Sequence, residues 1–356
     1  MELKWKPDWS QAKSNLIDWW NHKGLALCIF APRRTPVENI PQPVKPADVT
    51  AAWTDPVYRC SNAEWNMSRT LFAGEAFPYC DTQIGPGSLG IFIGATPGFA
   101  PETVWYEPCI DRPDSFHGIH FSPKNNRWLD VHTALIDEGL RRAKGRYLVG
   151  MPDLIENIDT LAALRGTEPL LMDLIERPKW IHARLAEINQ AFFASFDLIY
   201  GKIKADGGNA FAAFRIWGPG RTAKVQCDFS CMISPVMFGE FVAPSLTAQC
   251  EWLDYSMYHL DGTTALQHLD ALLAIEPLDA IEWTVQAGRP GGGSPEWYDL
   301  YRRIKDAGKS VQAIGVKPEE VVPLVKAVGP EGLFVMCNAE SEAAAKELID
   351  QARSVG

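Results

Sequence analysis

The sequence lacks the patterns that mark membrane, secreted and nucleic-acid-binding proteins. No apolar run approaches the ~18 residues that are needed to cross a bilayer. The first residues, MELKWKPDWSQAK, contain no basic region followed by an apolar core, as a secretory signal would. No stretch of Lys and Arg is interleaved with aromatic residues, and the formal net charge is −10, which opposes binding to polyphosphates. We therefore expect a cytoplasmic protein that binds neither membranes nor nucleic acids.

Motifs of common cofactor-binding proteins are also missing. No Gly-x-Gly-x-x-Gly follows the first predicted strand, which removes the usual argument for a dinucleotide-binding domain. The glycine-rich stretch at 286–295 lacks the Lys-Ser/Thr ending of a phosphate-binding loop, so we interpret it as a connection. The eight cysteines include no Cys-x-x-Cys pair, and without a secretory signal they are expected to be reduced thiols. What remains is a chain of 356 residues, 46% of them hydrophobic, which is typical of a packed globular enzyme.

Short apolar runs recur along the chain, and longer stretches with the periodicity of a helix lie between them. We predict eight strands, at residues 25–30, 76–85, 146–151, 210–218, 253–260, 279–285, 310–316 and 332–337. We predict amphipathic helices at residues 128–144, 155–200, 235–252, 263–275, 295–307, 317–328 and 340–354. This alternation, with strands that are apolar almost throughout, favours a closed parallel (β/α)8 barrel, or TIM barrel, over an open sheet. The fold class is therefore predicted to be α/β, with residues 1–356 in one domain.

The connection between the second and third predicted strands is too long for a simple crossover. Residues 86–127 are rich in Gly, Pro and aromatic residues and have little helical periodicity. Loops of this length in a compact domain are usually functional. We therefore predict that residues 86–127 form a lid over the barrel mouth and that Trp105 and Tyr106 bind substrate. A surface excursion without a function is the alternative.

Polar residues stand at the ends of several predicted strands, which is where TIM barrels carry their active sites. His259 and Asp261 are two apart in YHLDG, so both can face the barrel mouth if the strand continues that far. A hydrogen-bonded core imidazole is the alternative for His259, and a helix N-cap is the alternative for Asp261. Glu282 lies in the apolar run AIEWTV, where a carboxylate needs a partner or a raised pKa. The thiol of Cys337 is a further candidate, with packing as its alternative.

Other residues near the predicted mouth are candidates for substrate binding or are assigned no role. Trp217 and Tyr258 are predicted to form flat apolar walls of a pocket. Candidate polar contacts to substrate are Arg33, Asp153 and Arg215. Three histidines, His22, His182 and His268, are predicted to be solvated helix residues without a function.

Several longer segments are similar to those of one known superfamily. They are WWNHKG near the start, VGMPDLIENIDTLAALRGTEPLLMDLIERPKWIHARL at 149–185, CDFSCMISPVMFGEFVAPSL at 227–246, YHLDG and FVMCNAES. On these segments the chain resembles the uroporphyrinogen decarboxylase superfamily over nearly its whole length. This superfamily also includes zinc-dependent methyltransferases that move methyl groups between corrinoid proteins, thiols and methylated donors. The resemblance implies a TIM barrel with its site at the carboxyl ends of the strands.

The branch of the superfamily is indicated by two places in the sequence. True uroporphyrinogen decarboxylases carry Arg-Gln-Ala-Gly-Arg-Tyr after the first strand, whereas this chain reads APRRTP there, although Asp81 stands where that branch has its catalytic aspartate. The methyltransferase branch uses a His-x-Cys pair and a later lone Cys as zinc ligands. Here the matching residues are His259, Asp261 and Cys337, with a carboxylate in place of one thiolate, which zinc accepts. Asp228 stands where the superfamily often lines its pocket.

The resemblance therefore implies a zinc-dependent methyltransferase that exchanges methyl groups between a small substrate and a corrinoid protein or a thiol. His259 and Cys337 are predicted ligands, with Asp261 or Glu282 as the third, and Asp228 is predicted to position substrate. No Asp-x-His-x-x-Gly signature is present, so cobalamin is expected only on a separate partner protein. Two alternatives stay open: a metal-free decarboxylase or lyase that uses Asp81 and Glu282, and a ligand-binding barrel without catalysis. Both a monomer and a homodimer are compatible with the sequence.

Overall fold

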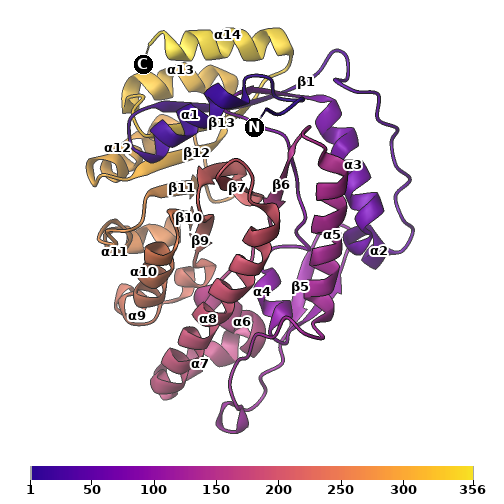
Figure 1. The fold of residues 1–356 in the computed structure, drawn as a ribbon. Coiled ribbons are helices and arrows are strands. Elements are labelled where there is room, and N and C mark those ends of the chain that lie inside the picture. Colours follow the sequence, from indigo (N-terminus) through magenta and orange to yellow (C-terminus); the bar gives the residue numbers. More distant parts are fainter. Residues whose placement is uncertain (1, 356) are drawn as a thin grey trace.

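The computed structural model describes residues 2–355 and has a mixed α/β fold with strands inside and helices outside (Figure 1). One sheet has the strand order β2-β1-β13-β12-β11-β10-β9, and a second has the order β3-β6-β7-β8. The first sheet consists of β1 (Leu25–Pro32), β2 (Thr70–Gly74), β9 (Thr222–Gln226), β10 (Tyr255–Asp261), β11 (Ala280–Thr284), β12 (Ser310–Val316) and β13 (Leu333–Asn338). The second consists of β3 (Tyr79–Cys80), β6 (Leu148–Met151), β7 (Gly208–Phe211) and β8 (Ile216–Pro219). Pairing is parallel except between β1 and β2 and between β7 and β8.

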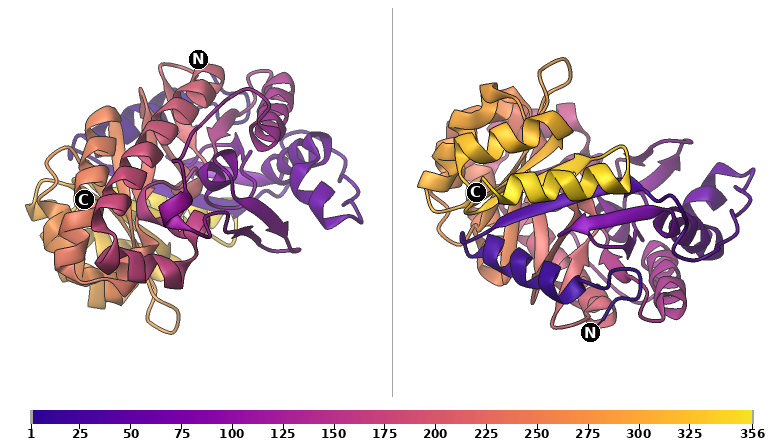
Figure 2. Two further views of the ribbon diagram at one scale, coloured as in Figure 1. Left: turned by 90° about the horizontal axis from the view of Figure 1, so that it is seen from below. Right: turned by 90° about the horizontal axis from the view of Figure 1, so that it is seen from above.

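Helices cover the outer side of the strands. The main helices are α1 (Trp9–Trp20), α3 (Pro56–Ser68), α5 (Arg127–Ala143), α6 (Asn157–Arg165), α7 (Thr167–Glu176), α8 (Pro178–Ile203), α10 (Ala243–Trp252), α12 (Tyr298–Asp306), α13 (Pro318–Val328) and α14 (Glu342–Arg353). Figure 2 shows α14 and α1 beside β1, and α12 and α13 pack on β12 and β13. Strands covered on the outside by helices and filled on the inside by side chains are apolar on both faces, which is why β1 is buried over most of its length.

The parallel α/β character predicted from the alternating pattern is confirmed. Most of the residue ranges predicted as strands contain a strand in the structure. The prediction of a single strand at 210–218 is wrong. β7 ends at Phe211, and after a turn at residues 213–215 the chain returns antiparallel to it as β8. The parallel strand of that region is β9, in TAKVQ, which the sequence analysis missed. Its alternating polar residues, Lys224 and Gln226, hid it from a search for continuous apolar runs.

Backbone pairing among the described residues does not join the two sheets into one continuous ring. No ladder links β1 to β3 or β7 to β9 within residues 2–355. At the second of these places the side chain of Asn209 substitutes for strand pairing. Its amide nitrogen donates to the carbonyl oxygen of Thr222 at 2.9 Å, and its oxygen accepts from the N–H of Thr222 at 2.9 Å. The predicted closure of the barrel therefore stays a prediction.

Two other predictions differ from the structure in detail. The long helix predicted at 155–200 is three helices, α6, α7 and α8, which are separated at Gly166 and at the Arg177–Pro178 step. Residues 86–127 contain α4 (Ser88–Phe92), the hairpin of β4 (Thr96–Phe99) and β5 (Val104–Glu107), and a short 3-10 turn at Pro113–Ser115. No helix within residues 2–355 has the length and apolarity required to cross a bilayer.

The N-terminal helix α1 was not predicted, yet it completes the core. Trp9 is buried and packs edge to face on Trp217 with 5.4 Å between ring centroids. The indole N–H of Trp20 donates to the carbonyl oxygen of Trp217 at 2.9 Å. The prediction that Trp217 forms a pocket wall is therefore wrong, because its ring is 1% exposed and belongs to the contact between α1 and β8.

Candidate functional site

Three polar side chains converge at the carboxyl ends of β9 and β10. β10 continues to Asp261, so His259 and Asp261 point the same way, as their spacing predicted. Asp228 follows β9 and begins a 3-10 turn, Asp228–Met232. One potential ligand atom from each of the three residues lies within 4.8 Å of the others, and His259 Nε2 is 4.0 Å from Asp228 Oδ1. Both carboxylates are exposed, so an ion would reach this group from solvent.

The imidazole of His259 is oriented from behind by a buried carboxylate. Glu282 occupies the register position beside His259 on β11, and its Oε2 lies 2.5 Å from His259 Nδ1. The hydroxyl of Thr284 donates to Glu282 Oε1 at 2.8 Å. Burial disfavours the charged imidazole, but the hydrogen bond and the charge of Glu282 outweigh this, so the pKa of His259 is raised. Because Nδ1 is used by Glu282, Nε2 is left to face Asp228, as in metal sites where a carboxylate orients a histidine ligand.

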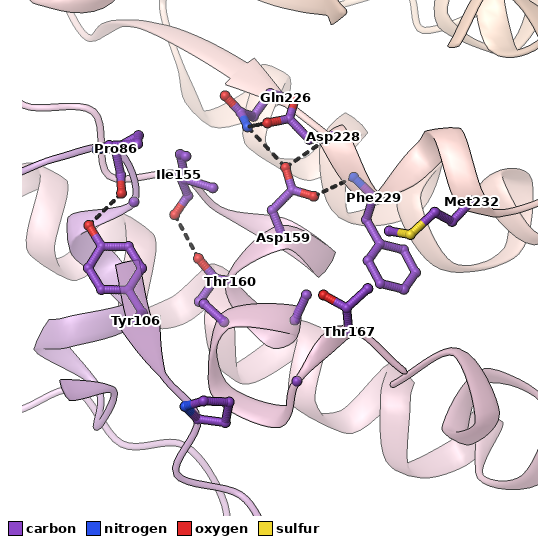
Figure 3. A pocket seen from close by; sticks show the side chains of 15 residues that line it. Pro86, Tyr106, Ile155, Asp159, Thr160, Thr167, Gln226, Asp228, Phe229 and Met232 are labelled. Atoms are coloured by element: carbon purple, nitrogen blue, oxygen red, sulfur yellow. Dashed lines mark hydrogen bonds between the residues drawn. The ribbon is translucent and has the colours of Figure 1, made fainter. Parts of the chain in front are cut away.

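Asp228 is held in place by a residue that the sequence analysis missed. Asp159 on α6 accepts hydrogen bonds from the backbone N–H groups of Asp228 and Phe229, both at 2.8 Å, and from the amide of Gln226 at 3.0 Å (Figure 3). The amide of Gln226 also donates to Asp228 Oδ2 at 2.9 Å. Burial and then the charge of Asp228 raise the pKa of Asp159 to about 6. These contacts tie the turn after β9 to α6.

A row of polar side chains crosses four neighbouring strands at one level. Gln226 on β9 pairs in register with His259, His259 with Glu282, and Glu282 with Gln312 on β12. Polar side chains at one level of adjacent parallel strands face the same side, and all four are largely shielded from solvent. The sequence signal for this row was weak, since β10, β11 and β12 each place one member of the row in a largely apolar strand, and β9 was not recognised as a strand.

A second buried network lies next to this row. Lys224 is on the same face of β9 as Gln226, and its ammonium forms an ion pair with Asp153 at 2.8 Å and donates to the side-chain oxygen of Gln226. Asp153, which follows β6, was predicted to bind substrate, but here its charge is balanced by Lys224. Glu156 accepts from the backbone N–H of Gln226 at 2.7 Å. The network therefore supports β9 from beneath the candidate site.

A cavity of about 520 Å³ adjoins the three converging residues and shares Asp228 and Gln226 with the site. Its lining is mainly apolar and aromatic, with no Lys, Arg or His: Pro86, Gly87, Tyr106, Pro108, Ile155, Asp159, Thr160, Ala162, Ala163, Gly166, Thr167, Gln226, Asp228, Phe229 and Met232. The segment 86–127 contributes Tyr106, whose hydroxyl donates to the carbonyl oxygen of Pro86 (Figure 3). Trp105 is not part of this lining; its indole N–H donates to Glu107 at 2.8 Å. A pocket of this size and character suits a small molecule.

Two of the predicted site residues, Asp81 and Arg215, line a separate cavity of about 290 Å³. Arg33 lies elsewhere, with its Nε donating to the carbonyl oxygen of Thr70 at 3.1 Å. Glu282 does not face either cavity, because both of its oxygens are engaged by His259 and Thr284. An acid/base pair of Asp81 and Glu282 is therefore not assembled by this geometry.

Cys337 does not join the converging residues. It lies on β13, and two strands, β11 and β12, separate β13 from β10 in the sheet. Burial, followed by the nearby charges of Glu319 and Glu320 on α13, raises the pKa of Cys337 to about 11. The group that the structure assembles consists of His259, Asp261 and Asp228, so Asp228 stands in place of the predicted ligand Cys337.

Tyr258 and His268 are also placed differently from their predictions. Tyr258 is 1% exposed and is no pocket wall, because consecutive strand residues face opposite sides and His259 occupies the side toward the site. His268 is buried rather than solvated, with Nε2 2.9 Å from the carbonyl oxygen of Ser230 and its ring stacked on Phe238. His22 and His182 are exposed, as predicted.

Comparisons with known proteins show a likeness of fold to solved structures. No protein-family model matches the chain, and no curated protein matches it. Among solved structures, a methyltransferase from Methanosarcina mazei has a similar fold, with a TM-score of 0.60, 13% sequence identity, and coverage of 96% of this chain and 98% of that chain. At this identity the likeness is one of fold, extending over the full length of both chains.

Proposed function

We propose that this protein is a metal-dependent methyltransferase with a zinc site formed by Asp228, His259 and Asp261. The observation that carries the proposal is the convergence of one imidazole nitrogen and two carboxylate oxygens within 4.8 Å of one another. The methyltransferase from Methanosarcina mazei, which shares the fold over its whole length, supports the class of reaction. The resemblance to the uroporphyrinogen decarboxylase superfamily favours the same class and a single (β/α)8-type barrel domain.

The donor atoms present fit zinc. Zinc accepts imidazole nitrogen and carboxylate oxygen, and three protein ligands leave a position open for substrate. In a tetrahedral site with bonds of about 2.1 Å, ligand atoms lie about 3.4 Å apart, so His259 Nε2 and Asp228 Oδ1, which are 4.0 Å apart, would move slightly closer on binding the ion. The Glu282 carboxylate behind His259 is the usual support for such a ligand. This ligand set differs from the predicted one in having Asp228 instead of Cys337.

The residues of the site would have separate roles in methyl transfer: some would bind the metal, some orient its ligands, and some exclude water. When bound, zinc would lower the pKa of a small thiol and make it a nucleophile at neutral pH. Glu282 holds His259 in the orientation that presents Nε2, and Asp159 holds Asp228 at the boundary of the 520 Å³ cavity. The apolar lining of that cavity excludes water from the methyl group. A separate corrinoid protein, or a thiol, is the proposed partner in the exchange.

Metal analysis tests the zinc site directly. Protein purified without chelator should contain about one zinc per chain, as expected for a single site, and His259→Ala should lose it. His182→Ala is the matched control, because His182 is exposed on α8 and lies outside the converging group. Absence of stoichiometric zinc, with no uptake on addition of the ion, would remove the metal from the proposal.

A transfer assay tests the reaction. We expect the zinc-loaded protein to move the methyl group of methylcobalamin to a small thiol, giving a methyl thioether and cob(I)alamin, and we expect His259→Ala to abolish the reaction. The thioether is measured by mass spectrometry. The methyltransferase assignment would be refuted if the zinc-loaded protein transferred no methyl group from methylcobalamin to any thiol tried, and none from a methyl thioether to cob(I)alamin. That result would leave the metal site intact.

A further inference from the structure

Two side chains of opposite charge, neither in an ion pair among the described residues, line one small cavity that shares no lining residue with the candidate metal site. The cavity has a volume of about 290 Å³ and is lined by Ala63, Asn66, Met67, Thr70, Phe72, Tyr79, Asp81 and Arg215. None of the three proposed metal ligands is among these residues. Within residues 2–355, neither Asp81 nor Arg215 forms an ion pair with any other group.

Arg215 is held over the cavity by a strained turn. Phe214 and Arg215 are consecutive non-glycine residues with φ values of 58° and 55°. Such conformations cost of the order of 1 kcal/mol or more each and are found where function requires them. The turn is fixed on both sides. The carbonyl oxygen of Phe214 accepts from the amide of Gln312 at 2.9 Å, and the Arg215 guanidinium lies over the ring of Phe30 at 4.4 Å. Among the described residues, no side chain or carbonyl accepts from this guanidinium, so its hydrogen-bond donors can serve a ligand.

Asp81 provides the opposite charge from a more enclosed position. One of its oxygens accepts from the backbone N–H of Gln83 at 2.9 Å, and no other hydrogen bond to this carboxylate is formed within residues 2–355. The charge of the nearby Arg59 acts on Asp81 and lowers its pKa, but the hydrogen bonds of that guanidinium go to the carbonyl oxygens of Trp53 and Gln83 rather than to the carboxylate. Burial raises the pKa of Asp81 and outweighs the opposing charges of Arg59 and Arg215.

We propose that this cavity binds a small zwitterion, with the ligand's carboxylate on Arg215 and its ammonium group beside Asp81. A ligand with one charge would leave the other protein group without a hydrogen-bonded partner of opposite charge, and a neutral ligand would leave both so, whereas a zwitterion places an opposite charge beside each. The volume is at the low end for small-molecule sites, so the ligand is of amino-acid size. The rings of Phe72 and Tyr79 favour an alkylated ammonium, because aromatic faces attract such cations.

The orientation of Tyr79 supports this assignment. Its hydroxyl donates to the carbonyl oxygen of Ala212 at 2.6 Å, so the ring is fixed at the wall of the cavity. Ala212 also precedes the strained turn that carries Arg215. The two halves of the subsite are therefore linked by one hydrogen bond between β3 and the end of β7. The residues of this cavity come from other strands than the proposed metal ligands, although the ring of Phe214, next to Arg215, lies 4.6 Å from the ring of His259.

Isothermal titration calorimetry with four probes tests the proposal. Glycine and N,N,N-trimethylglycine carry both charges, acetate carries only the negative one, and tetramethylammonium only the positive one. We expect each zwitterion to bind at least ~10-fold more tightly than either singly charged probe. Glycine adds a charged hydrogen bond to Asp81, whereas the trimethylammonium group, which has no N–H, adds its charge and its contact with the aromatic rings. Two outcomes would overturn the proposal. One is an affinity for acetate equal to that for glycine, and the other is the absence of saturable binding of either zwitterion.

Two substitutions separate the two ends of the subsite. Arg215→Gln should weaken binding of both zwitterions about 10- to 100-fold and leave tetramethylammonium unaffected. Asp81→Asn should weaken the zwitterions similarly and leave acetate unaffected. Arg302→Gln on α12, which is 46% exposed and distant in the fold, is the matched control. Arg215→Lys keeps the charge and should restore part of the affinity, which a merely misfolded variant would not. Equal loss of all four probes in both variants would refute the assignment of separate charged ends.

Discussion

Glu156 is the clearest case in which the fold holds a carboxyl group neutral, and its titration can be followed as stability. It is 1% exposed, at the residue before α6, and its Oε1 accepts from the backbone N–H of Gln226 at 2.7 Å. Burial is the largest influence and raises its pKa to about 8; Asp153 and Asp159 add to this effect, while Lys224 opposes it. The ordinary value is 4.5.

The sign of the effect on stability follows from which state keeps the proton. Below pH 4.5 the group is protonated in both states and contributes no difference. Between 4.5 and 8 the folded protein keeps a proton that the unfolded chain releases, so the free energy of unfolding falls as pH rises. At 1.36 kcal/mol per pKa unit, the shift from 4.5 to about 8 corresponds to a loss of about 5 kcal/mol, complete above pH 8.

Glu156→Gln removes the titration but keeps an oxygen that accepts from Gln226. We expect this variant to become progressively more stable than the wild type between pH 5 and pH 9, by up to about 5 kcal/mol in urea unfolding. Glu168→Gln, at an exposed position in the first turn of α7, is the control and should follow the wild-type pH profile. Parallel curves for wild type and Glu156→Gln across this range would show that the carboxyl is not held neutral, and the reasoning about the buried network would be wrong.

Three further predictions concern the site and the fold. Glu282→Gln keeps an acceptor for the imidazole but removes its charge, so zinc affinity in a chelator competition should fall about 10-fold; unchanged affinity would contradict its orienting role. Asp159→Ala removes the acceptor of the turn that carries Asp228, and we expect a loss of about 2 kcal/mol or more in urea unfolding together with weaker zinc binding; Asp159→Asn should lose less. Gly208→Ala places a Cβ 1.9 Å from a backbone oxygen and should cost about 3 kcal/mol or more, whereas Gly201→Ala in α8 meets nothing within 4 Å and should stabilise by about 0.5–1 kcal/mol.

The strands that could be predicted were those whose residues are apolar throughout. β1, β12 and β13 are covered by helices on one side and packed on the other, so burial leaves a continuous signal in the sequence. β9 gave no such signal, because Lys224 and Gln226 face the buried polar network. The antiparallel turn from β7 to β8 was hidden for a different reason: Phe214 and Arg215 adopt a conformation that their residue types disfavour.

The candidate site was predictable only where its residues are neighbours in the chain. His259 and Asp261 share a strand, so strand periodicity alone put them on one side. Asp228 was singled out only through the resemblance, because β9, the strand that it follows, was missed, and nothing in the sequence paired it with His259. Asp159 had no signal beyond its place in the first turn of a helix, where acidic residues are common.

By itself, the sequence determined the alternation of strands and helices and the polar residues that stand at the strand ends, because those features depend on local periodicity. The tertiary structure decided which of these residues meet. That outcome depends on the order of strands in the sheet, which puts β9, β10 and β11 side by side and keeps β13 two strands away. Asp228 and Glu282 therefore approach His259, while the Cys337 thiol stays apart, because distance across a sheet is set by pairing rather than by residue type.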